Sequence, residues 1–159
     1  MRIRSASAED RDRIHEILVS TAVFSQEEID VAMELVDAFL QATDKDYIVD
    51  VVEDDSAAVQ GYVCFGPTPL TDGVFDLYWI AVDPKQQGHG FGQILVRYVE
   101  NEVRRRNGRM LLIETSSKEM YGPTVRFYER SGYDEISRIK DFYRIADDKV
   151  VFCKRISPS

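Results

Sequence analysis

One stretch of the sequence, Asp83-Pro84-Lys85-Gln86-Gln87-Gly88-His89-Gly90-Phe91-Gly92-Gln93-Ile94-Leu95, joins an apolar segment to an amphipathic one. The preceding residues, 74–82, are rich in β-branched and aromatic side chains, which favours a strand, and Pro84 stops that strand. Three alternating glycines let the backbone turn sharply and lie close to a ligand. The first amides of the following helix lack partners within the helix, and with the helix dipole they favour a phosphate group. The stretch therefore predicts an anion-binding loop between a strand and a helix.

Two other phosphate-binding patterns fit this stretch badly. A Walker loop ends in Gly-Lys-Ser or Gly-Lys-Thr, and the chain contains neither ending. A dinucleotide-binding fingerprint reads Gly-x-Gly-x-x-Gly near the first strand of a βαβ unit, with an acidic residue about 20 positions later. Here the glycines alternate as Gly88-x-Gly90-x-Gly92, and the following helix runs on to Asn107-Gly108. ATP and NAD are therefore not the expected ligands.

The pattern Gln87-x-x-Gly90-x-Gly92, after a strand that ends in Ile-Ala-Val-Asp-Pro, resembles the acyl-CoA pyrophosphate loop of the GNAT superfamily of N-acyltransferases. A second block, Thr124-Val125-Arg126-Phe127-Tyr128-Glu129-Arg130-Ser131-Gly132-Tyr133, resembles the second signature of that superfamily. The segments Lys140-Asp141-Phe142-Tyr143 and Asp147-Asp148-Lys149-Val150-Val151-Phe152 resemble its C-terminal strands. The blocks follow one another in the order that the superfamily has.

The resemblance implies an α/β (α+β) fold in a single N-acetyltransferase domain over residues 1–159. Its centre would be a mixed, mostly antiparallel sheet of about seven strands flanked by about four helices. The chain length of 159 residues suits one compact domain. The residue patterns predict strands at 2–4, 47–53, 59–65, 74–82, 110–115, 133–139 and 149–155. They predict helices that start at Ser7 and at the capping box Ser25-x-x-Glu28, and helices over 91–107 and 123–130.

Composition excludes several classes of protein. A formal net charge of −8 argues against broad nucleic-acid binding, which needs a basic patch to displace counterions. No apolar run approaches the roughly 20 residues that span a bilayer, so no membrane association is expected. Residues 1–6 have no apolar signal-peptide core, and Cys64 and Cys153 lack metal-ligand spacing. We therefore expect a cytoplasmic protein with reduced thiols.

Acidic residues are concentrated in one part of the chain. Between residues 25 and 60, eleven Asp or Glu accompany a single lysine, Lys45, whereas the helix at 91–107 ends in Arg104-Arg105-Arg106. Solvated helix faces and favourable interactions with a helix dipole explain this pattern in ordinary structural terms. Alternatively, the acidic part attracts a cationic acceptor and the arginines attract an anionic cofactor.

An acyltransferase must deprotonate its amine, stabilise a tetrahedral oxyanion and help a thiolate to leave. The resemblance implies a bulge in the strand at 74–82, where the pantetheine arm pairs with backbone groups of the strand. The residues expected to bind acetyl-CoA or another acyl-CoA are Ile80, Ala81, Val82, Gln87, Gly88, His89, Gly90, Phe91, Gly92, Gln93 and Phe127. His89 is expected to act through its backbone amide. With only one further histidine, His15, no metal is expected.

Tyr128 is the candidate general acid, because the resemblance aligns it with the tyrosine that has this role in many relatives. A phenol with a pKa near 10 stays protonated and can donate to a thiolate. In the alternative interpretation Tyr128 only packs in the core, since Tyr121, Val125 and Tyr128 have helical spacing. The family often has Asn and Ala where this chain has Tyr121 and Thr124.

Two carboxylates compete for the role of general base. Asp76 lies in an otherwise apolar strand, where some relatives place a catalytic glutamate, and burial there would raise its pKa. Glu114 lies in Leu111-Leu112-Ile113-Glu114-Thr115, the neighbouring strand in this topology, and could act directly or through a water. For each of them, a polar position at the solvated face or end of its strand is the alternative.

The expected function is N-acetyl transfer from acetyl-CoA to a primary amine by direct transfer in a ternary complex. No nucleophile elbow or triad spacing indicates a covalent acyl-enzyme. The first two helices, residues 66–73 and residues 141–143 would wall the acceptor pocket. Their acidic and aromatic residues suit a small cationic or amino-acid-like amine, or a protein N-terminus or lysine. A non-catalytic acyl-CoA-binding regulator and an interaction module are the alternatives, and an exposed C-terminal strand edge would allow a homodimer.

Overall fold

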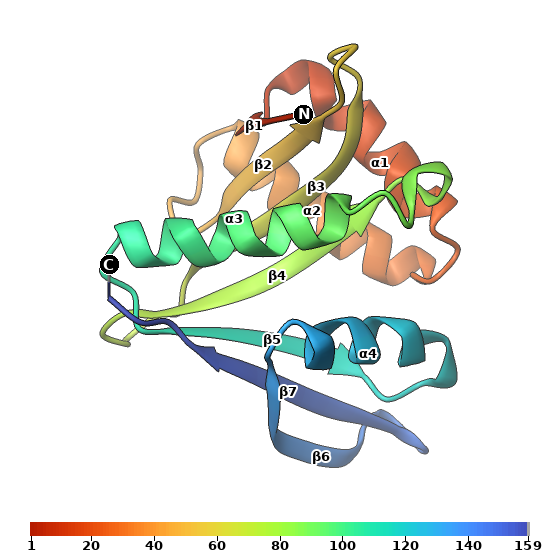
Figure 1. The fold of residues 1–159 in the computed structure, drawn as a ribbon. Coiled ribbons are helices and arrows are strands. Elements are labelled where there is room, and N and C mark those ends of the chain that lie inside the picture. The colour runs from red at the N-terminus through yellow and green to blue at the C-terminus, as the bar shows by residue number, and fades with distance from the viewer. Residues whose placement is uncertain (159) are drawn as a thin grey trace. The chain divides into compact units, whose positions relative to one another are not determined.

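The computed structural model describes residues 1–158, in which strands and helices are interleaved (Figure 1). The strands are β1 (Arg2–Ser5), β2 (Ile48–Glu53), β3 (Val59–Pro67), β4 (Val74–Val82), β5 (Met110–Ser116), β6 (Asp134–Arg144) and β7 (Asp147–Arg155). The helices are α1 (Arg11–Ser20), α2 (Gln26–Leu40), α3 (Phe91–Arg105) and α4 (Gly122–Arg130). Short 3-10 helices cover Ala8–Asp10, Pro84–Gln86 and Glu119–Tyr121.

The strands form one sheet in the order β1-β2-β3-β4-β5-β7-β6. β4 and β5 are parallel, whereas β1 and β2, β2 and β3, β5 and β7, and β6 and β7 pair in antiparallel fashion. The parallel pair is connected through α3, because parallel neighbours cannot be joined by a short hairpin. The expected mixed, mostly antiparallel sheet of seven strands with four helices is confirmed for the described residues.

The C-terminal hairpin is longer than the sequence pattern predicts. β6 continues past Ile139, where the strand was expected to end, and β7 begins at Asp147. The pairing shifts register between Ile139 and Arg144, so residues 140–143 form a bulge within the strand. The strand resumes after these residues, and Arg144 pairs with Asp147.

Two helix boundaries also differ from the prediction. α3 ends two residues before Asn107, because Asn107 has a left-handed backbone with φ 58°. The Gly108 amide then donates to the Val103 carbonyl over 2.8 Å, which completes the cap. At the N-terminus, Ser7 precedes a 3-10 turn, and the first α-helix begins only at Arg11.

The chain divides into two compact units, each with its own packing. The first contains Met1–Pro67 and Tyr78–Val99. Within it, α1 and α2 cover one face of β1–β3, and the first turns of α3 lie over the other face (Figure 1). The core on the α1 and α2 side comprises Ile14, Ile17, Leu18, Ile29, Ala32, Met33, Val36, Val49, Val51, Val59, Tyr62, Cys64 and Ala81. On the α3 side, the Tyr98 hydroxyl donates to Asp50 Oδ2 over 2.8 Å and attaches the helix to β2.

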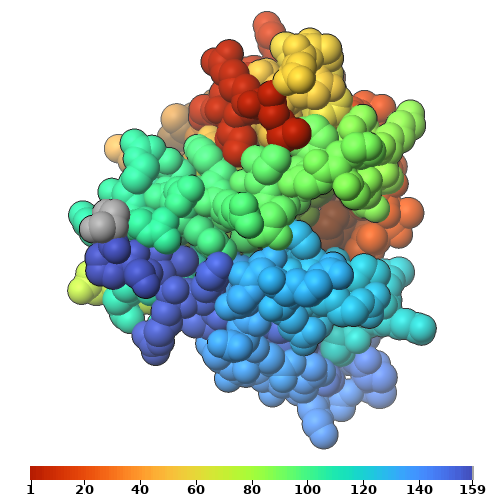
Figure 2. All heavy atoms as spheres, viewed as in Figure 1, coloured from red at the N-terminus to blue at the C-terminus, as the bar shows by residue number. Residues whose placement is uncertain are grey.

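Ion pairs fix the N-terminal strand within this unit. The Met1 amino nitrogen lies 2.5 Å from Asp55 Oδ1, and Figure 2 shows the red N-terminal atoms against the yellow β2–β3 turn. Arg4 donates to Glu53 Oε1 over 2.6 Å and to Asp10 Oδ2 over 2.7 Å. The hydrogen bond from Arg4 lowers the pKa of Asp10. These contacts join β1, the following turn and β2.

The second unit contains Thr68–Leu77 and the chain from Glu100 onward. In this unit α4 lies on β5 and β7, and the Tyr128 ring is 6.1 Å from that of Phe152 and 5.9 Å from that of Tyr133. The Tyr133 hydroxyl donates to Glu100 Oε1 over 3.0 Å, and Lys154 Nζ donates to the same oxygen over 2.9 Å. The buried Glu100 carboxylate therefore has both a neutral and a cationic partner.

The two cysteines are free, buried thiols, as the sequence predicts. Burial raises the pKa of Cys64 to about 12, so its thiol is protonated at neutral pH. None of the helices formed by residues 1–158 is long and apolar enough to cross a membrane.

Candidate active site

The glycine-rich loop begins at a firmly held strand end in the first unit. The Asp83 amide donates to the Gln60 carbonyl over 2.8 Å, and the Asp83 carboxylate caps the Lys85 amide at 2.9 Å. Arg13 Nη2 lies 2.5 Å from Asp83 Oδ2. The hydrogen bond from the Lys85 amide, together with Arg13, lowers the pKa of Asp83. The carboxylate therefore stays ionised and holds the start of the loop in place.

Gly88 and Gly90 have the backbone conformations that the loop needs. Their φ angles are 82° and 85°, values that L side chains rarely adopt. No heavy atom would lie within 4 Å of a Cβ added at either residue, so the space in front of both is open. Among residues 1–158, no carbonyl accepts a hydrogen bond from either amide. The loop thus offers free donors and open space, as a bound pyrophosphate requires.

His89 differs from its neighbours in the loop. Its amide donates to the Gln86 carbonyl over 3.3 Å, and its ring Nδ1 lies 3.3 Å from the same oxygen. The expectation that His89 presents its amide to phosphate therefore requires this long hydrogen bond to open. The side chains of Gln87 and His89 are exposed, whereas Phe91 is buried and anchors the first turn of α3.

The strand residues expected to contact pantetheine follow an irregular part of β4. Tyr78 and Trp79 are consecutive, yet both pack against the same core of the first unit, which interrupts the alternation of a regular strand. Further along, Gly61 lets β3 approach closely, because a Cβ there would lie 2.8 Å from the Ala81 carbonyl oxygen. Ile80 and Val82 are half-buried and Ala81 is buried.

Two buried polar atoms near this region were missed by the sequence interpretation. Tyr62 Oη and Trp79 Nε1 are both inaccessible to solvent and have no hydrogen-bond partner among residues 1–158. Buried polar groups are nearly always satisfied, so unsatisfied ones are unusual features of a native structure. Whether the polar atom of a tyrosine or tryptophan finds a partner depends on three-dimensional packing, which the residue type does not reveal.

Tyr128 lies in the second unit and is 3% exposed. Burial raises the pKa of its hydroxyl, so the phenol keeps its proton through the physiological pH range. The hydroxyl forms no hydrogen bond within residues 1–158, and it is not among the completely inaccessible atoms. Phe127, the neighbouring candidate, contacts Tyr128 with ring centres 5.6 Å apart. The ring thus packs in the core, while the hydroxyl remains available as a proton donor.

The structure brings the two candidate bases to one face of the sheet. Asp76 on β4 is paired with Leu112 on β5, so Glu114, two residues further along β5, points to the same side. Such diagonal neighbours lie roughly 7 Å apart, a distance that one small molecule can bridge. We refer to this side of the second unit as the Asp76–Glu114 face.

The two carboxylates have different surroundings. Asp76 is half-buried, and its Oδ2 accepts a hydrogen bond from the Thr68 hydroxyl over 2.6 Å. The Glu114 side chain is 51% exposed, and its Oε1 lies 3.2 Å from Lys149 Nζ. Asp76 is therefore the more buried of the two carboxylates, and Glu114 is the one that is ion-paired with a lysine.

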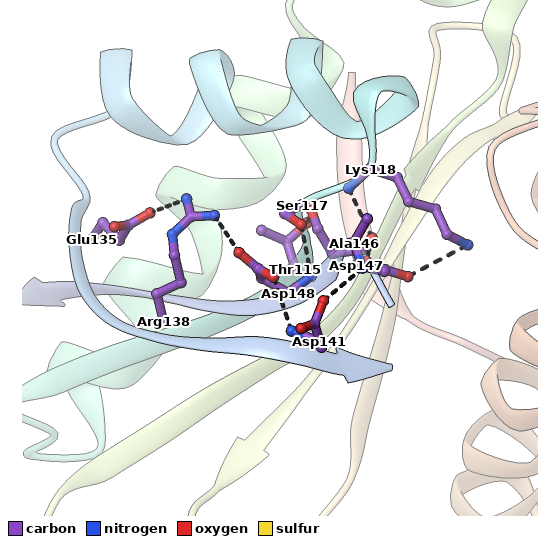
Figure 3. A network of polar contacts seen from close by, with 10 residues as sticks. Thr115, Ser117, Lys118, Glu135, Arg138, Asp141, Ala146, Asp147 and Asp148 are labelled. Atoms are coloured by element: carbon purple, nitrogen blue, oxygen red, sulfur yellow. Dashed lines mark hydrogen bonds and ion pairs between the residues drawn. The ribbon is translucent and has the colours of Figure 1, made fainter. Parts of the chain in front are cut away.

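A polar network fixes the hairpin beside this face (Figure 3). The Asp148 amide donates to the Ser117 hydroxyl over 2.7 Å, and Ser116 is hydrogen-bonded to Asp147. Lys118 Nζ lies 3.6 Å from Asp147 Oδ2. The end of β5 is therefore connected by side chains to the start of β7.

A cleft of about 330 Å³ opens on the other side of this unit, between α4 and β6. It is lined by Ser117, Lys118, Glu119, Gly122, Val125, Arg126, Arg138 and Val150. None of the residues predicted from the sequence to form the active site lines it. In the part of the chain that the structure describes, no group of three or more His, Cys, Asp or Glu side chains is placed to hold a metal ion.

The sequence and structure comparisons assign the chain to a family. Residues 45–135 match the sequence model of the acetyltransferase (GNAT) domain. The fold also matches the crystal structure of a protein assigned to the GNAT family of acetyltransferases from Desulfovibrio desulfuricans. That match has a TM-score of 0.90 and 41% sequence identity, and it covers 98% of this chain and 99% of the other. The chain belongs to the GNAT acetyltransferase family, whose members are acetyl-CoA-dependent N-acetyltransferases.

More distant structures share the fold. The aminoglycoside 6'-N-acetyltransferase from Enterococcus faecium has a TM-score of 0.77 at 19% identity, and the match covers 100% of this chain and 99% of that one. The ribosomal-protein-S18-alanine N-acetyltransferase from Escherichia coli has a TM-score of 0.73 at 18% identity, covering 99% and 95%. Among curated proteins, none matches the chain. Enzymes named for a small-molecule acceptor and for a protein acceptor thus share this architecture.

Proposed function

We propose that this GNAT acetyltransferase transfers an acetyl group directly from acetyl-CoA to a primary amine, and that residues 1–159 act as one catalytic domain. The observation that carries the proposal is the loop at Gly88 and Gly90, with its left-handed glycines, free amides and open space. A side chain at either position would enter the volume that a pyrophosphate needs. The family's sequence model, residues 45–135, includes this loop as well as Asp76, Glu114 and Tyr128.

Each remaining step has a proposed residue. The backbone of Ile80, Ala81 and Val82 would bind the pantetheine arm, and Gln87 through Gln93 would bind the phosphates. Phe127 is proposed to contact the cofactor from α4. Acetyl-CoA supplies the thioester, and the chain's own groups supply the proton transfers.

Tyr128 is proposed to protonate the departing thiolate, because its hydroxyl keeps its proton at neutral pH and has no hydrogen-bond partner among residues 1–158. Asp76 is proposed to accept the proton of the amine, since it is the more buried of the two carboxylates on its face. Glu114 then remains to bind the acceptor. The acceptor class supported best is a small amine with a second positive charge, given the two carboxylates on this face.

Thermal unfolding with and without ligands tests the proposal. Acetyl-CoA and CoA should raise the melting temperature, because a ligand that binds only the native state stabilises it in proportion to concentration over affinity. NAD and ATP serve as controls. A panel of primary amines then follows, with free-thiol release as the readout. A shift with NAD or ATP alone would overturn the assignment of the loop.

A further inference from the structure

The Lys149 ammonium group contacts a carboxylate and an aromatic ring, the kinds of group that also bind cationic ligands. Its Nζ lies 3.2 Å from Glu114 Oε1 and 4.8 Å from the centre of the Phe142 ring. A carboxylate and the face of an aromatic ring are the two groups that proteins commonly use to bind ammonium ions. The same pair would therefore accept an ammonium group from another molecule.

Three strands build this arrangement. Lys149 on β7 is paired with Ser116 on β5 and with Ile139 on β6. Glu114 lies two residues before Ser116, so its side chain reaches Lys149 diagonally across the ladder. All of these positions belong to the Asp76–Glu114 face. The cation is thus held on the face that carries the proposed base.

Phe142, which contacts Lys149 together with Glu114, lies in the bulge of β6. Between Ile139 and Arg144, β6 has more residues than the segment of β7 that it faces. Asp141 adopts a left-handed backbone with φ 55°, and its amide donates to Asp148 Oδ1 over 3.0 Å. The Asp141 carboxylate accepts from the Ala146 amide over 2.6 Å, so both ends of the bulge are tied (Figure 3). The ring is held in position by hydrogen bonds of its own hairpin, without being buried.

The position of Lys149 is one that another cation can take. Glu114 and Phe142 are about half exposed, so a ligand can reach both groups that bind the Lys149 ammonium, although the Lys149 side chain itself is 21% exposed. Lysine is a compact charge on a flexible stem, so its ammonium can leave while its backbone stays paired. Asp76 lies on the same face and adds negative charge. An incoming ammonium group would restore the neutral pairing that Lys149 provides.

We propose that Glu114 and Phe142 form a subsite for a second ammonium group of the acceptor, and that Lys149 is a tethered occupant which this group displaces. The proposal rests on the proposed function, because it names the acceptor class of that reaction. Diamines and larger polyamines are then preferred over monoamines. Lys149 lowers the apparent affinity for diamines and polyamines, because these amines bind only to protein molecules in which the Lys149 side chain has left the subsite.

A titration with tetramethylammonium tests the subsite without any turnover. The chemical shifts of the Phe142 ring are followed by NMR, with sodium chloride at the same ionic strength as the reference. Lys149→Met should tighten binding about tenfold if Lys149 fills the subsite in about nine-tenths of the molecules. Lys140→Met removes the same charge from the same hairpin and should leave the affinity unchanged. Equal affinities in the wild type and in Lys149→Met would overturn the proposal.

Steady-state kinetics then test its effect on the reaction. The ratio of KM for 1,4-diaminobutane to KM for 1-aminobutane should fall in Lys149→Met and rise in Phe142→Leu, which keeps an apolar side chain without the ring. A Lys149→Met variant that instead raises KM only for amines with a carboxylate would show that Lys149 binds an anion, and the proposal would be wrong. If tetramethylammonium binds as expected but no amine is acetylated, the proposed function fails while the subsite stands.

Discussion

Tyr128 and Glu114 lie on opposite faces of the sheet in the second unit. Tyr128 packs on Phe152, whose partner in the ladder is Ile113, and Glu114 is the next residue along β5. Successive residues of a strand point to opposite sides, so the proposed acid and the carboxylate on the acceptor side are separated by the strand itself. In the proposed reaction the amine attacks the carbonyl carbon of the thioester and the thiolate leaves it, so Tyr128 would serve the sulfur while the Asp76–Glu114 face would bind the amine.

Tyr128→Phe should lower kcat about 100-fold while changing the affinity for acetyl-CoA little, because it removes one proton donor and leaves the packing intact. The Tyr128 hydroxyl has no hydrogen bond to lose within residues 1–158, so the melting temperature should stay close to that of the wild type. Single-turnover thiol release and isothermal titration with CoA measure the two quantities.

Tyr133→Phe is the matched control for Tyr128→Phe, since Tyr133 belongs to the same aromatic cluster. It should retain turnover. An unchanged kcat in Tyr128→Phe would remove Tyr128 from the mechanism and leave it as a core residue.

Asp76→Asn and Glu114→Gln should separate the roles of the two carboxylates. Asp76→Asn should lower kcat about 100-fold or more and remove the acidic limb from the pH dependence of kcat/KM, because the general base is lost. Glu114→Gln should act mainly on KM for dicationic amines. The pH dependence of kcat/KM is measured for each variant with one diamine. Loss of the acidic limb in Glu114→Gln instead of Asp76→Asn would identify Glu114 as the base.

The arrangement of strands and helices was predictable because two sequence periods were clear. Apolar residues alternate or run continuously in the expected strands other than 133–139, and the buried stripe of α3 (Leu95, Val96, Val99 and Val103) has helical spacing. The boundaries failed where backbone conformation decides. Asn107 and Asp141 both have positive φ. Asn107-Gly108 indicated the end of α3 to within two residues, whereas nothing in the local pattern indicates that β6 continues through Asp141.

The candidate site was predictable only in part, for a similar reason. Glycine at positions 88 and 90 indicates a backbone conformation that other residues rarely adopt, so the loop could be located from the sequence. The ion-pair partner of Glu114 could not be predicted from the sequence, because Lys149 is 35 residues away along the chain and only strand pairing brings the two together. The unsatisfied atoms of Tyr62 and Trp79 depend on packing in three dimensions, which residue types do not specify.

Gly90→Ala should weaken the binding of acetyl-CoA at least tenfold, a cost of about 1.4 kcal/mol. The added methyl group enters open space, so it meets no atom of the protein and would meet the ligand instead. The backbone at φ 85° adds a stability cost of about 1 kcal/mol.

Gly73→Ala is the matched control for Gly90→Ala. Gly73 also has a positive φ, 74°, but its added Cβ would lie 3.2 Å from the Asn107 carbonyl oxygen. This variant should lose stability without losing affinity for acetyl-CoA. Titration calorimetry and urea unfolding give the two quantities for each variant, and equal loss of affinity in both would mean that strain, rather than contact with the ligand, explains the effect.

Tyr62→Phe should leave the free energy of unfolding at pH 7 unchanged or raise it by about 1 kcal/mol, because the buried hydroxyl has no hydrogen-bond partner in the described part of the chain. Burial also raises the pKa of Tyr62. The unfolded chain releases this proton above about pH 10 while the folded chain keeps it, so Tyr62 alone should lower the stability of the wild type by about 1.4 kcal/mol per pH unit there, a contribution that Tyr62→Phe removes. The advantage of the variant should therefore grow as the pH rises from 10 to 11.

Tyr133→Phe gives the contrasting result that makes this test decisive. The Tyr133 hydroxyl donates to Glu100, so its removal should cost about 2 kcal/mol at pH 7. Burial and Glu100 raise the pKa of Tyr133 as well, so both variants should show a shallower loss of stability in alkali than the wild type. Urea unfolding at pH 7, 10 and 11 compares the three proteins. A clear loss of stability at pH 7 in Tyr62→Phe would mean that its hydroxyl is hydrogen-bonded in solution.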